Sequence, residues 1–272
     1  MSGALREFDV DRLRANLAAR HPGRAPVVGR RLEFHSRLDS TNDRARDLAA
    51  SGEPEGTVVL ADEQSRGRGR GDRSWHSPPG LGVYLSVILR PAAPAANAPF
   101  FGLLAAVAAA GALEGSIKWP NDIMISGRKV AGILTEARTS SDTIREVVIG
   151  VGANVNQEQR DFPESIARLA TSLRLERGRT LDRTDVACDI LTALDEWYNL
   201  CSREGSGPIR ESYERLAEGL SGRRVEVGDG NGSFQGVTEG LSLDGALRVR
   251  RADGAREIVE VRYGEVRRVE AR

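Results

Sequence analysis

The 272-residue sequence contains few of the residues that build disulfide frameworks or metal centres. Its two cysteines, Cys188 and Cys201, fall in one expected helix, which separates them by roughly 20 Å, too far for a disulfide bond. The three histidines are scattered along the chain, and no Cys/His spacing typical of a metal site occurs. This composition fits a protein of the reducing cytoplasm.

The sequence also lacks an excess of charge and a long apolar run. Lysine plus arginine equals aspartate plus glutamate at 39 each, which disfavours binding to nucleic acid or to a membrane surface through bulk charge. The N-terminus has no apolar signal-peptide core, and the longest apolar run, 98–113, contains glycines and is too short to cross a bilayer. We therefore expect neither a DNA partner nor a membrane partner.

The familiar nucleotide and hydrolase motifs are absent as well. There is no G-x-x-x-x-G-K-[ST] phosphate loop and no G-x-S-x-G elbow, and a dinucleotide fingerprint beginning at Gly67 would need a glycine where Asp72 stands. Both cysteines lie far from the glycine- and arginine-rich segments, so neither is a plausible nucleophile. These absences favour direct, noncovalent activation by ATP over a covalent enzyme intermediate.

The length and a hydrophobic fraction of 40% suffice for one main domain and a small appended one. Helical patterns occupy 9–20, 98–113, 182–202 and 208–217, and Ser40 is expected to cap a helix that ends at Gly52. Strand patterns occupy 31–35, 57–63, 82–90, 116–119, 122–126, 129–137 and 143–152, the last two as a hairpin.

After Gly219 the pattern changes to short alternating strands at 223–227, 233–238, 247–251 and 257–262. Gly- and Asp-rich turns at 228–232, 243–245 and 252–254 separate them, which favours a small β-barrel. The predicted division is a catalytic domain at 1–218 and a C-terminal domain at 219–272.

Residues 64–75 are the most informative segment. Arginines and glycines alternate from Arg66 to Gly71, and Asp72, Arg73 and then Trp75 follow. Glycines let backbone N–H groups approach an anion, while the guanidinium groups of Arg68 and Arg70 make bidentate contacts to phosphate or carboxylate. The alternative is a disordered, RNA-contacting segment, which the two strong flanking strands disfavour.

Lys118-Trp-Pro-Asn-Asp122 joins two strands and offers a cation, an aromatic ring, an amide and a carboxylate. Asp122 is a candidate Mg²⁺ ligand, because magnesium in nucleotide sites is held by one or two carboxylates plus phosphate oxygens. A tight turn fixed by Pro120 explains the same residues, and the sequence leaves both interpretations open.

Two further strands carry candidate residues. Lys129 stands at the entrance of an apolar strand in which Gly132 suggests close approach by a ligand, although a solvated lysine is the common case. Gly150 and Gly152 share one face of their strand and leave room for a flat group, and Asn154 follows. A bulge or twist is the alternative explanation of these glycines.

Taken together, these segments resemble the biotin–protein ligase family in order and spacing, over essentially the whole chain from about Asp9. The segments that carry the resemblance are Ser40-Thr-Asn42, Gln64, Gly67-Arg-Gly-Arg70, Arg73-Ser-Trp75, Lys118-Trp-Pro-Asn-Asp122, Arg128-Lys-Val-Ala-Gly-Ile-Leu134 and Gly150-Val-Gly-Ala-Asn154.

The resemblance implies a mixed β-sheet flanked by helices, of the class II synthetase-like type, followed by an SH3-like barrel. It implies that biotin and MgATP give biotinyl-5′-AMP and pyrophosphate, and that the adenylate then acylates a lysine of a biotin carboxyl carrier domain. No tightly bound cofactor is expected. The family contains dimers formed through the sheet as well as monomers, so a homodimer is possible. Its repressor members carry an N-terminal DNA-binding domain, for which too few residues precede Ser40, and we expect a ligase alone.

The resemblance also assigns roles to individual residues. Ser40, Thr41 and Gln64 would bind the ureido end of biotin, Arg68 and Arg70 would close over its carboxylate and the phosphate, and Lys129 would stabilise the developing charge. The full biotin site would comprise Ser40, Thr41, Asn42, Gln64, Gly67, Arg68, Gly69, Arg70, Lys129 and Gly132. The ATP site would comprise Arg70, Arg73, Trp75, Lys118, Asn121, Gly152 and Asn154, with Asp122 or Asn121 placing the metal ion.

One departure stands out. The family usually has a glycine where this chain has Asp72. Aspartate tolerates a left-handed backbone, so the loop can still form, but its charge would alter ATP binding or loop closure. The alternatives to a biotin ligase are a lipoate ligase or acyltransferase of the same broad fold, and a nonenzymatic RNA-binding protein.

Overall fold

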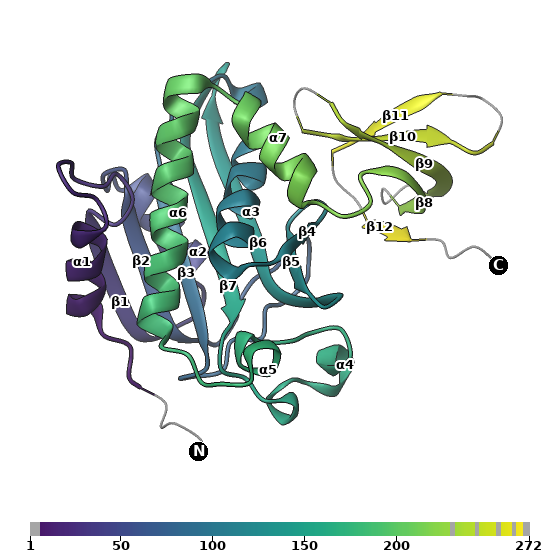
Figure 1. The fold of residues 1–272 in the computed structure, drawn as a ribbon. Helices are drawn as coiled ribbons and strands as arrows, with labels where there is room; N and C mark the ends of the chain where they lie inside the picture. Colours follow the sequence, from purple (N-terminus) through teal and green to yellow (C-terminus); the bar gives the residue numbers. More distant parts are fainter. Residues whose placement is uncertain (1–5, 229–231, 243–244, 254–256, 263–264, 269–272) are drawn as a thin grey trace.

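The computed structural model describes residues 6–228, 232–242, 245–253, 257–262 and 265–268. These residues form a large β-sheet flanked by helices and a small C-terminal sheet, which Figure 1 shows beside the edge of the large one. The expected fold class, a mixed sheet flanked by helices with a small β-rich unit at its end, is confirmed.

The helices and strands follow the expected order. The helices are α1 (Val10–Ala19), α2 (Thr41–Ala50), α3 (Phe100–Leu113), α4 (Glu164–Ala167), α5 (Leu173–Arg177), α6 (Arg183–Glu204) and α7 (Gly207–Leu216), with 3-10 turns η1 (Ala95–Asn97) and η2 (Gln159–Asp161). The strands of the large sheet are β1 (Arg31–Leu38), β2 (Thr57–Gln64), β3 (Gly82–Leu89), β4 (Ser116–Lys118), β5 (Asp122–Ile125), β6 (Arg128–Ser140) and β7 (Thr143–Asn154). The strands of the small sheet are β8 (Ser221–Gly228), β9 (Ser233–Leu241), β10 (Leu247–Arg251), β11 (Ile258–Val261) and β12 (Glu265–Arg268).

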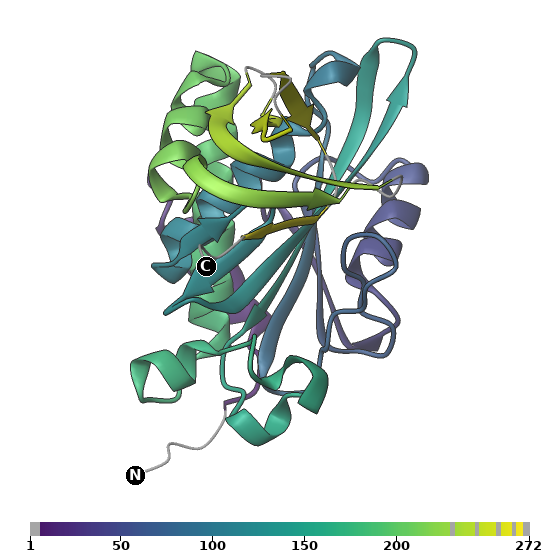
Figure 2. The ribbon, with the colours of Figure 1, turned by 90° about the vertical axis from the view of Figure 1, so that its right-hand side faces the viewer.

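The large sheet has the strand order β1-β2-β3-β7-β6-β5-β4. β1 and β2 are parallel and are joined through α2, whereas every other neighbouring pair is antiparallel. The hairpin of β6 and β7, expected from the sequence, supplies two of the inner strands. Figure 2 shows helices on both faces of this sheet.

Alternate residues of the same strands serve the two faces, as the period of a β-strand requires. Val58 and Leu60 of β2 belong to the main core with α3 and α6. Val59, between them, joins a smaller cluster under α2 that contains Ala45 and Leu48. Because both faces are covered, the strands are apolar almost throughout, which explains why β2 and β3 were easy to predict.

The expected helix at 98–113 begins at Phe100, after the separate 3-10 turn η1. The run 98–113 was expected to be too short to cross a membrane, but the segment Ala95–Leu113 begins three residues earlier and would suffice by length and composition; 61% of its most apolar stretch is buried inside the molecule. α3 packs against α6, α7 and strands β4 to β7. Its run of alanines allows this close packing, so the apolar character has a structural explanation.

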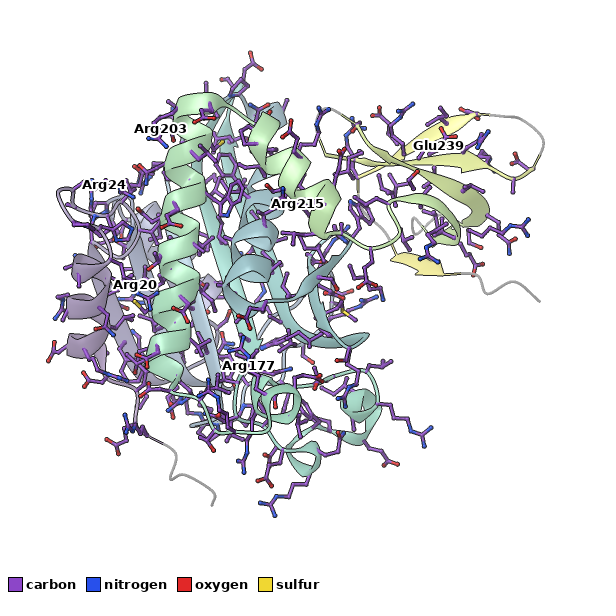
Figure 3. All side chains as sticks on the ribbon, viewed as in Figure 1. Arg20, Arg24, Arg177, Arg203, Arg215 and Glu239 are labelled. Carbon is purple, nitrogen blue, oxygen red and sulfur yellow. The ribbon has the colours of Figure 1, made fainter. Side chains whose placement is uncertain are left out.

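Ion pairs attach the N-terminal region to α6. Arg20 contacts Asp189 at 2.6 Å, and Arg24 contacts the fully buried Asp195 at 2.6 Å. Figure 3 labels both arginines beside α6. Asp195 also accepts hydrogen bonds from the backbone N–H groups of Val27 and Val28, so its buried charge is well compensated.

The small sheet is antiparallel, in the order β11-β10-β9-β8-β12. The four strands expected after Gly219 are present. Of the turns expected at 228–232, 243–245 and 252–254, residues 229–231, 243–244 and 254 lie outside the described residues. β12 was not expected, because its sequence has no clear apolar alternation. The Glu218 N–H donates to the carbonyl of Ile117 at 2.9 Å, which attaches this sheet to the end of β4.

Residues 155–181, for which no element was expected, fold into η2, α4 and α5. This segment returns to the large sheet at Lys129: the Lys129 N–H donates to the carbonyl of Leu169, and its carbonyl accepts from Thr171. The entrance of β6 is therefore held from both sides, by β5 and by this segment.

Candidate active site

A cavity of about 730 Å³ opens over the middle of the large sheet. Its walls come from the start of α2, the loop 68–75, the β4–β5 turn and strands β3, β6 and β7. Most residues predicted for the site line it: Ser40, Thr41, Asn42, Gln64, Arg68, Gly69, Arg70, Arg73, Trp75, Lys118, Asn121, Asp122, Lys129, Gly132 and Gly152.

Strand register explains how distant segments meet here. Asp122 of β5 pairs with Gly132 of β6, which in turn pairs with Gly152 of β7. The next row on the same face pairs Leu134 with Gly150, and Gly150 with Ser86 of β3. The glycines are thus neighbours across the sheet, and together they make a depression in its surface.

One end of the cavity is a polar network at the start of α2. Ser40 is the N-cap, as predicted, and accepts a hydrogen bond from the Asp43 N–H. The backbone N–H and the hydroxyl of Thr41 both donate to Gln64 Oε1, at 2.9 and 3.1 Å. This end presents hydrogen-bonding groups on rigid elements, which suits recognition of a neutral polar group.

Arg68 is held by carboxylates. Its guanidinium donates to both carboxylate oxygens of Glu136, at 2.9 and 3.1 Å, and to Asp43 at 2.8 Å. Hydrogen bonding of the guanidinium to the Glu136 carboxylate is the main cause that raises the pKa of Arg68. In this state Arg68 fixes the loop to β6 and α2.

Arg70 has a different environment. Within the described part of the chain it makes no ion pair, and it lies partly buried in the cavity wall. Burial, and then the neighbouring charge of Arg73, lower the pKa of Arg70 from its ordinary value. The charge of Asp122 acts in the opposite direction. A partly desolvated guanidinium that makes no ion pair among the described residues is a site where an anion is stabilised.

Trp75 fills the depression made by the glycines. A Cβ atom on Gly152 would lie 2.4 Å from the Trp75 indole nitrogen, and one on Gly132 would lie 3.1 Å from the ring. Lys129 Nζ lies 5.2 Å from the centre of the same ring and 2.5 Å from Asp122 Oδ1. The flat group that the glycines were expected to admit is, in this structure, the indole of the chain itself.

Two predicted residues do not line the cavity. Gly67 packs against the Trp75 carbonyl and the Ser77 hydroxyl, where a Cβ atom would lie 2.4 and 2.7 Å from them. The buried Asn154 donates to the Thr171 carbonyl at 3.0 Å and accepts from Gln157 at 3.3 Å. Both contact the loops around the site, and the Asn154 amide is engaged by Thr171 and Gln157 and not by the cavity.

The carboxylates of the site do not form a metal cluster. Over the described ranges, no group of three or more His, Cys, Asp or Glu side chains is placed to hold a metal ion. Asp122 stands in the cavity wall with Lys129 as its ion-pair partner. One carboxylate of this kind fits an ion that arrives with a nucleotide and keeps phosphate and water ligands.

The sequence did not indicate Ser86, Glu136 or Val266. Ser86 is fully buried, and its hydroxyl lies within hydrogen-bonding distance of Asn42 Oδ1 at 2.6 Å and of Thr41 Oγ1 at 2.8 Å. Val266 of the small sheet lines the cavity. A serine within the apolar strand 82–89 was the one available signal, since a buried hydroxyl needs polar partners.

Comparison with known protein families gives two matches. Residues 34–154 match the Biotin/lipoate A/B protein ligase family, and residues 220–267 match the Biotin protein ligase C terminal domain. The first match covers nearly all of the cavity residues, and the second covers the small sheet.

Two curated relatives are similar over most of their length. The bifunctional ligase/repressor BirA of Bacillus subtilis is 41% identical over 238 residues, which are 85% of this chain and 73% of the relative. The biotin–[acetyl-CoA-carboxylase] ligase of Paracoccus denitrificans is 34% identical over 240 residues, 84% of this chain and 99% of the relative.

A solved structure is similar in fold. The biotin protein ligase from Aquifex aeolicus, in complex with biotin and ATP, superposes with a TM-score of 0.72 at 31% identity, over 88% of this chain and 100% of that one.

Proposed function

The chain belongs to the biotin protein ligase family, and on that premise we propose that it joins biotin to a lysine of a carrier protein at the expense of ATP. In the first step a carboxylate oxygen of biotin attacks the α-phosphorus of ATP, and pyrophosphate leaves. In the second step the ε-amine of the lysine attacks the acyl carbon of biotinyl-5′-AMP, AMP leaves, and the amine gives up a proton.

The observation that carries this proposal is that neutral hydrogen-bonding groups and cationic side chains line the same cavity. A polar network at Thr41 and Gln64 stands at one end, and the cations Arg70 and Lys129 stand beyond it. A molecule with a polar head and a distant carboxylate would fit this separation, and the cations would stabilise the negative charge where carboxylate meets phosphate.

The relatives favour biotin over other acids. The family match includes lipoate ligases, but the Paracoccus relative is named as a biotin–[acetyl-CoA-carboxylase] ligase, and the Aquifex structure contains biotin and ATP. Thr41 and Gln64 present hydrogen-bonding groups to the cavity. The ureido ring of biotin has N–H donors and a carbonyl acceptor that can pair with such groups, whereas the dithiolane ring of lipoate has neither.

The roles proposed for the nucleotide side rest on position. Arg70, Arg73, Lys118 and Asn121 would contact ATP, and Trp75 would form a wall against the adenine. Magnesium enters as part of the substrate MgATP, and Asp122 would contribute its one carboxylate to that ion. Gly152, which has no side chain, would leave room for the Trp75 ring. Asn154 would contact the adenine only after its present hydrogen bonds are broken.

The partner proposed for the second step is the biotin carboxyl carrier domain of a carboxylase. Such a reaction takes place where carboxylases are made, and we propose a cytoplasmic location, in keeping with two cysteines that are both free.

The test is release of pyrophosphate from MgATP with biotin, lipoate or octanoate supplied separately. We expect release with biotin alone and a biotinyl-AMP that stays bound to the protein. Release with lipoate or octanoate instead would keep the adenylation chemistry and change the substrate. If no acid supports release, the ligase proposal is wrong.

A further inference from the structure

Glu136 is not among the predicted site residues, yet it contacts two other segments, the arginine- and glycine-rich loop and α2. Its carboxylate accepts hydrogen bonds from Arg68 at 2.9 and 3.1 Å and from Asn42 Nδ2 at 2.9 Å, and Arg46 lies 3.5 Å away. The side chain is 23% exposed, so these contacts are only partly screened by water. The residue is on β6, seven positions after Lys129.

A continuous chain of hydrogen bonds leads from Glu136 to the polar end of the cavity. Asn42 accepts from Ser86 at 2.6 Å, and Ser86 contacts Thr41 at 2.8 Å. Thr41 donates to Gln64 Oε1 at 3.1 Å.

Gln64 then donates to the Ser77 hydroxyl at 2.8 Å, and this hydroxyl donates to the Trp75 carbonyl at 3.1 Å. The chain therefore begins at Arg68 and ends at Trp75, the two sides of the arginine- and glycine-rich loop. Buried networks of this kind hold one geometry when every member has a partner.

The geometry leads us to infer that Glu136 is a positioning residue, which aligns the biotin-recognition end of the cavity with the loop by binding Arg68 and Asn42 at the same time. Glu136 does not touch substrate in this scheme. Together with the Leu134 carbonyl, which accepts from Asn42 Nδ2 at 3.3 Å, it fixes the Asn42 amide so that its oxygen faces Ser86. It also fixes Arg68 so that the loop lies over the cavity. This inference rests on the proposed function, because it assigns biotin to the Thr41–Gln64 end.

Asp43 provides a matched comparison. Its carboxylate also accepts from Arg68, at 2.8 Å, and it contacts Arg46 at 2.6 Å, but its side chain makes no hydrogen bond to Asn42 among the described residues. Asp43→Asn and Glu136→Gln each remove one negative charge next to Arg68. Only the second removes a charge that also holds the Asn42 amide.

The experiment measures two quantities: the dissociation constant of biotin, by calorimetry, and the rate of tryptic cleavage in the ligand-free loop. Both are measured in wild type and in the variants Glu136→Gln, Asp43→Asn, Arg68→Gln and Arg68→Gln/Glu136→Gln. For Glu136→Gln we expect about tenfold weaker biotin binding, since hydrogen bonds to a charged group are lost. Cleavage after the loop arginines should become faster. Asp43→Asn should change biotin binding by less than about threefold. The double variant should bind biotin no more weakly than the weaker-binding of the two single variants Arg68→Gln and Glu136→Gln, since the two residues act together.

Each result supports or overturns the positioning role. Equal biotin affinity in wild type and Glu136→Gln, or strictly additive losses in the double variant, would overturn the inference while leaving the ligase proposal intact. Failure of wild type itself to bind biotin would instead contradict the proposed function. If Glu136→Gln melts more than about 10 °C below wild type, biotin affinity is measured below its transition, and an unchanged affinity there still refutes the positioning role.

Discussion

Arg68 and Arg70 are separated by one glycine, and their surroundings are opposite. Arg68 is engaged by Glu136 and Asp43, whereas Arg70 has no ion-pair partner in the described ranges and sits partly buried in the cavity wall. An arginine already neutralised by two carboxylates is a weaker anion ligand than one that is not. The structure therefore favours Arg70 for the contact with phosphate or carboxylate, and Arg68 for holding the loop.

The two arginines can be separated by matched substitutions. Arg70→Gly should release biotinyl-AMP from the enzyme about tenfold faster or more, because the adenylate loses a charged contact. Arg68→Gly is also expected to leak adenylate, since the loop loses its attachment to β6. Retention of adenylate on a spin column, and labelling of bystander proteins, measure the leak. No leak from either variant would exclude a retaining role for this loop.

Lys129 is expected to act on the reaction step more than on binding. Lys129→Ala should reduce biotinyl-AMP formation by about a hundredfold or more, because a fixed cation stabilises charge that develops in the transition state. The dissociation constant of biotin should change by less than about threefold. Pre-steady-state adenylate formation and calorimetry measure the two quantities. Equal losses in both would count against the assignment.

At the scale of elements, the glycines of β7 leave the space in which the Trp75 ring lies. Gly152→Ala should raise the KM for ATP about tenfold, because the added Cβ atom would lie 2.4 Å from the Trp75 indole and displace it. Gly111→Ala is the control, since a Cβ atom added there would meet nothing within 4 Å and the helix should gain about 0.5–1 kcal/mol. An unchanged KM in Gly152→Ala would show that the position of Trp75 does not matter for ATP.

A second prediction concerns the attachment of α2 to β1. Two hydrogen bonds from Arg44 and one from His35 outweigh burial and lower the pKa of Glu33. A depressed carboxyl pKa stabilises the fold above the ordinary value of roughly 4.3, and this stabilisation is lost as pH falls through the depressed value. Glu33→Gln should cost about 1 kcal/mol at pH 7, after discounting the exposure of Arg44. The gap in unfolding free energy should close below about pH 4 in urea titrations. A gap independent of pH would contradict this.

The elements differed in how well the sequence predicted them. The sequence predicted β2, β3 and the β6–β7 hairpin well, because their residues are apolar almost throughout or alternate strongly. The segment 155–181 was not predicted, because its short helices are fixed by distant contacts such as Thr171 to Lys129. Asn154 was expected to face a ligand from its place at a strand end, and the same segment instead occupies its amide. Glu136 was overlooked because its partners come from α2 and the loop, which no local pattern reveals.

At the scale of the whole molecule, the small sheet takes part in the cavity. Val266 of β12 lines it, and the sheet is attached to β4 through Glu218 and Ile117. Val266→Glu should slow pyrophosphate release, because a carboxylate in the wall would repel the phosphates of ATP. Biotin affinity and melting temperature are the controls. An unchanged rate would mean that the small sheet only covers the cavity.

During synthesis α3 is made well before α6, one of the helices that cover it. It is apolar on all sides, and its cover comes partly from α6, which begins only at Arg183. At roughly 5–20 residues per second, ribosomes need several seconds to make the intervening chain. During that interval the apolar surface of α3 that α6 covers in the folded protein lacks this cover. Expression yield should therefore depend on chaperones that bind apolar segments, whatever the stability of the finished enzyme.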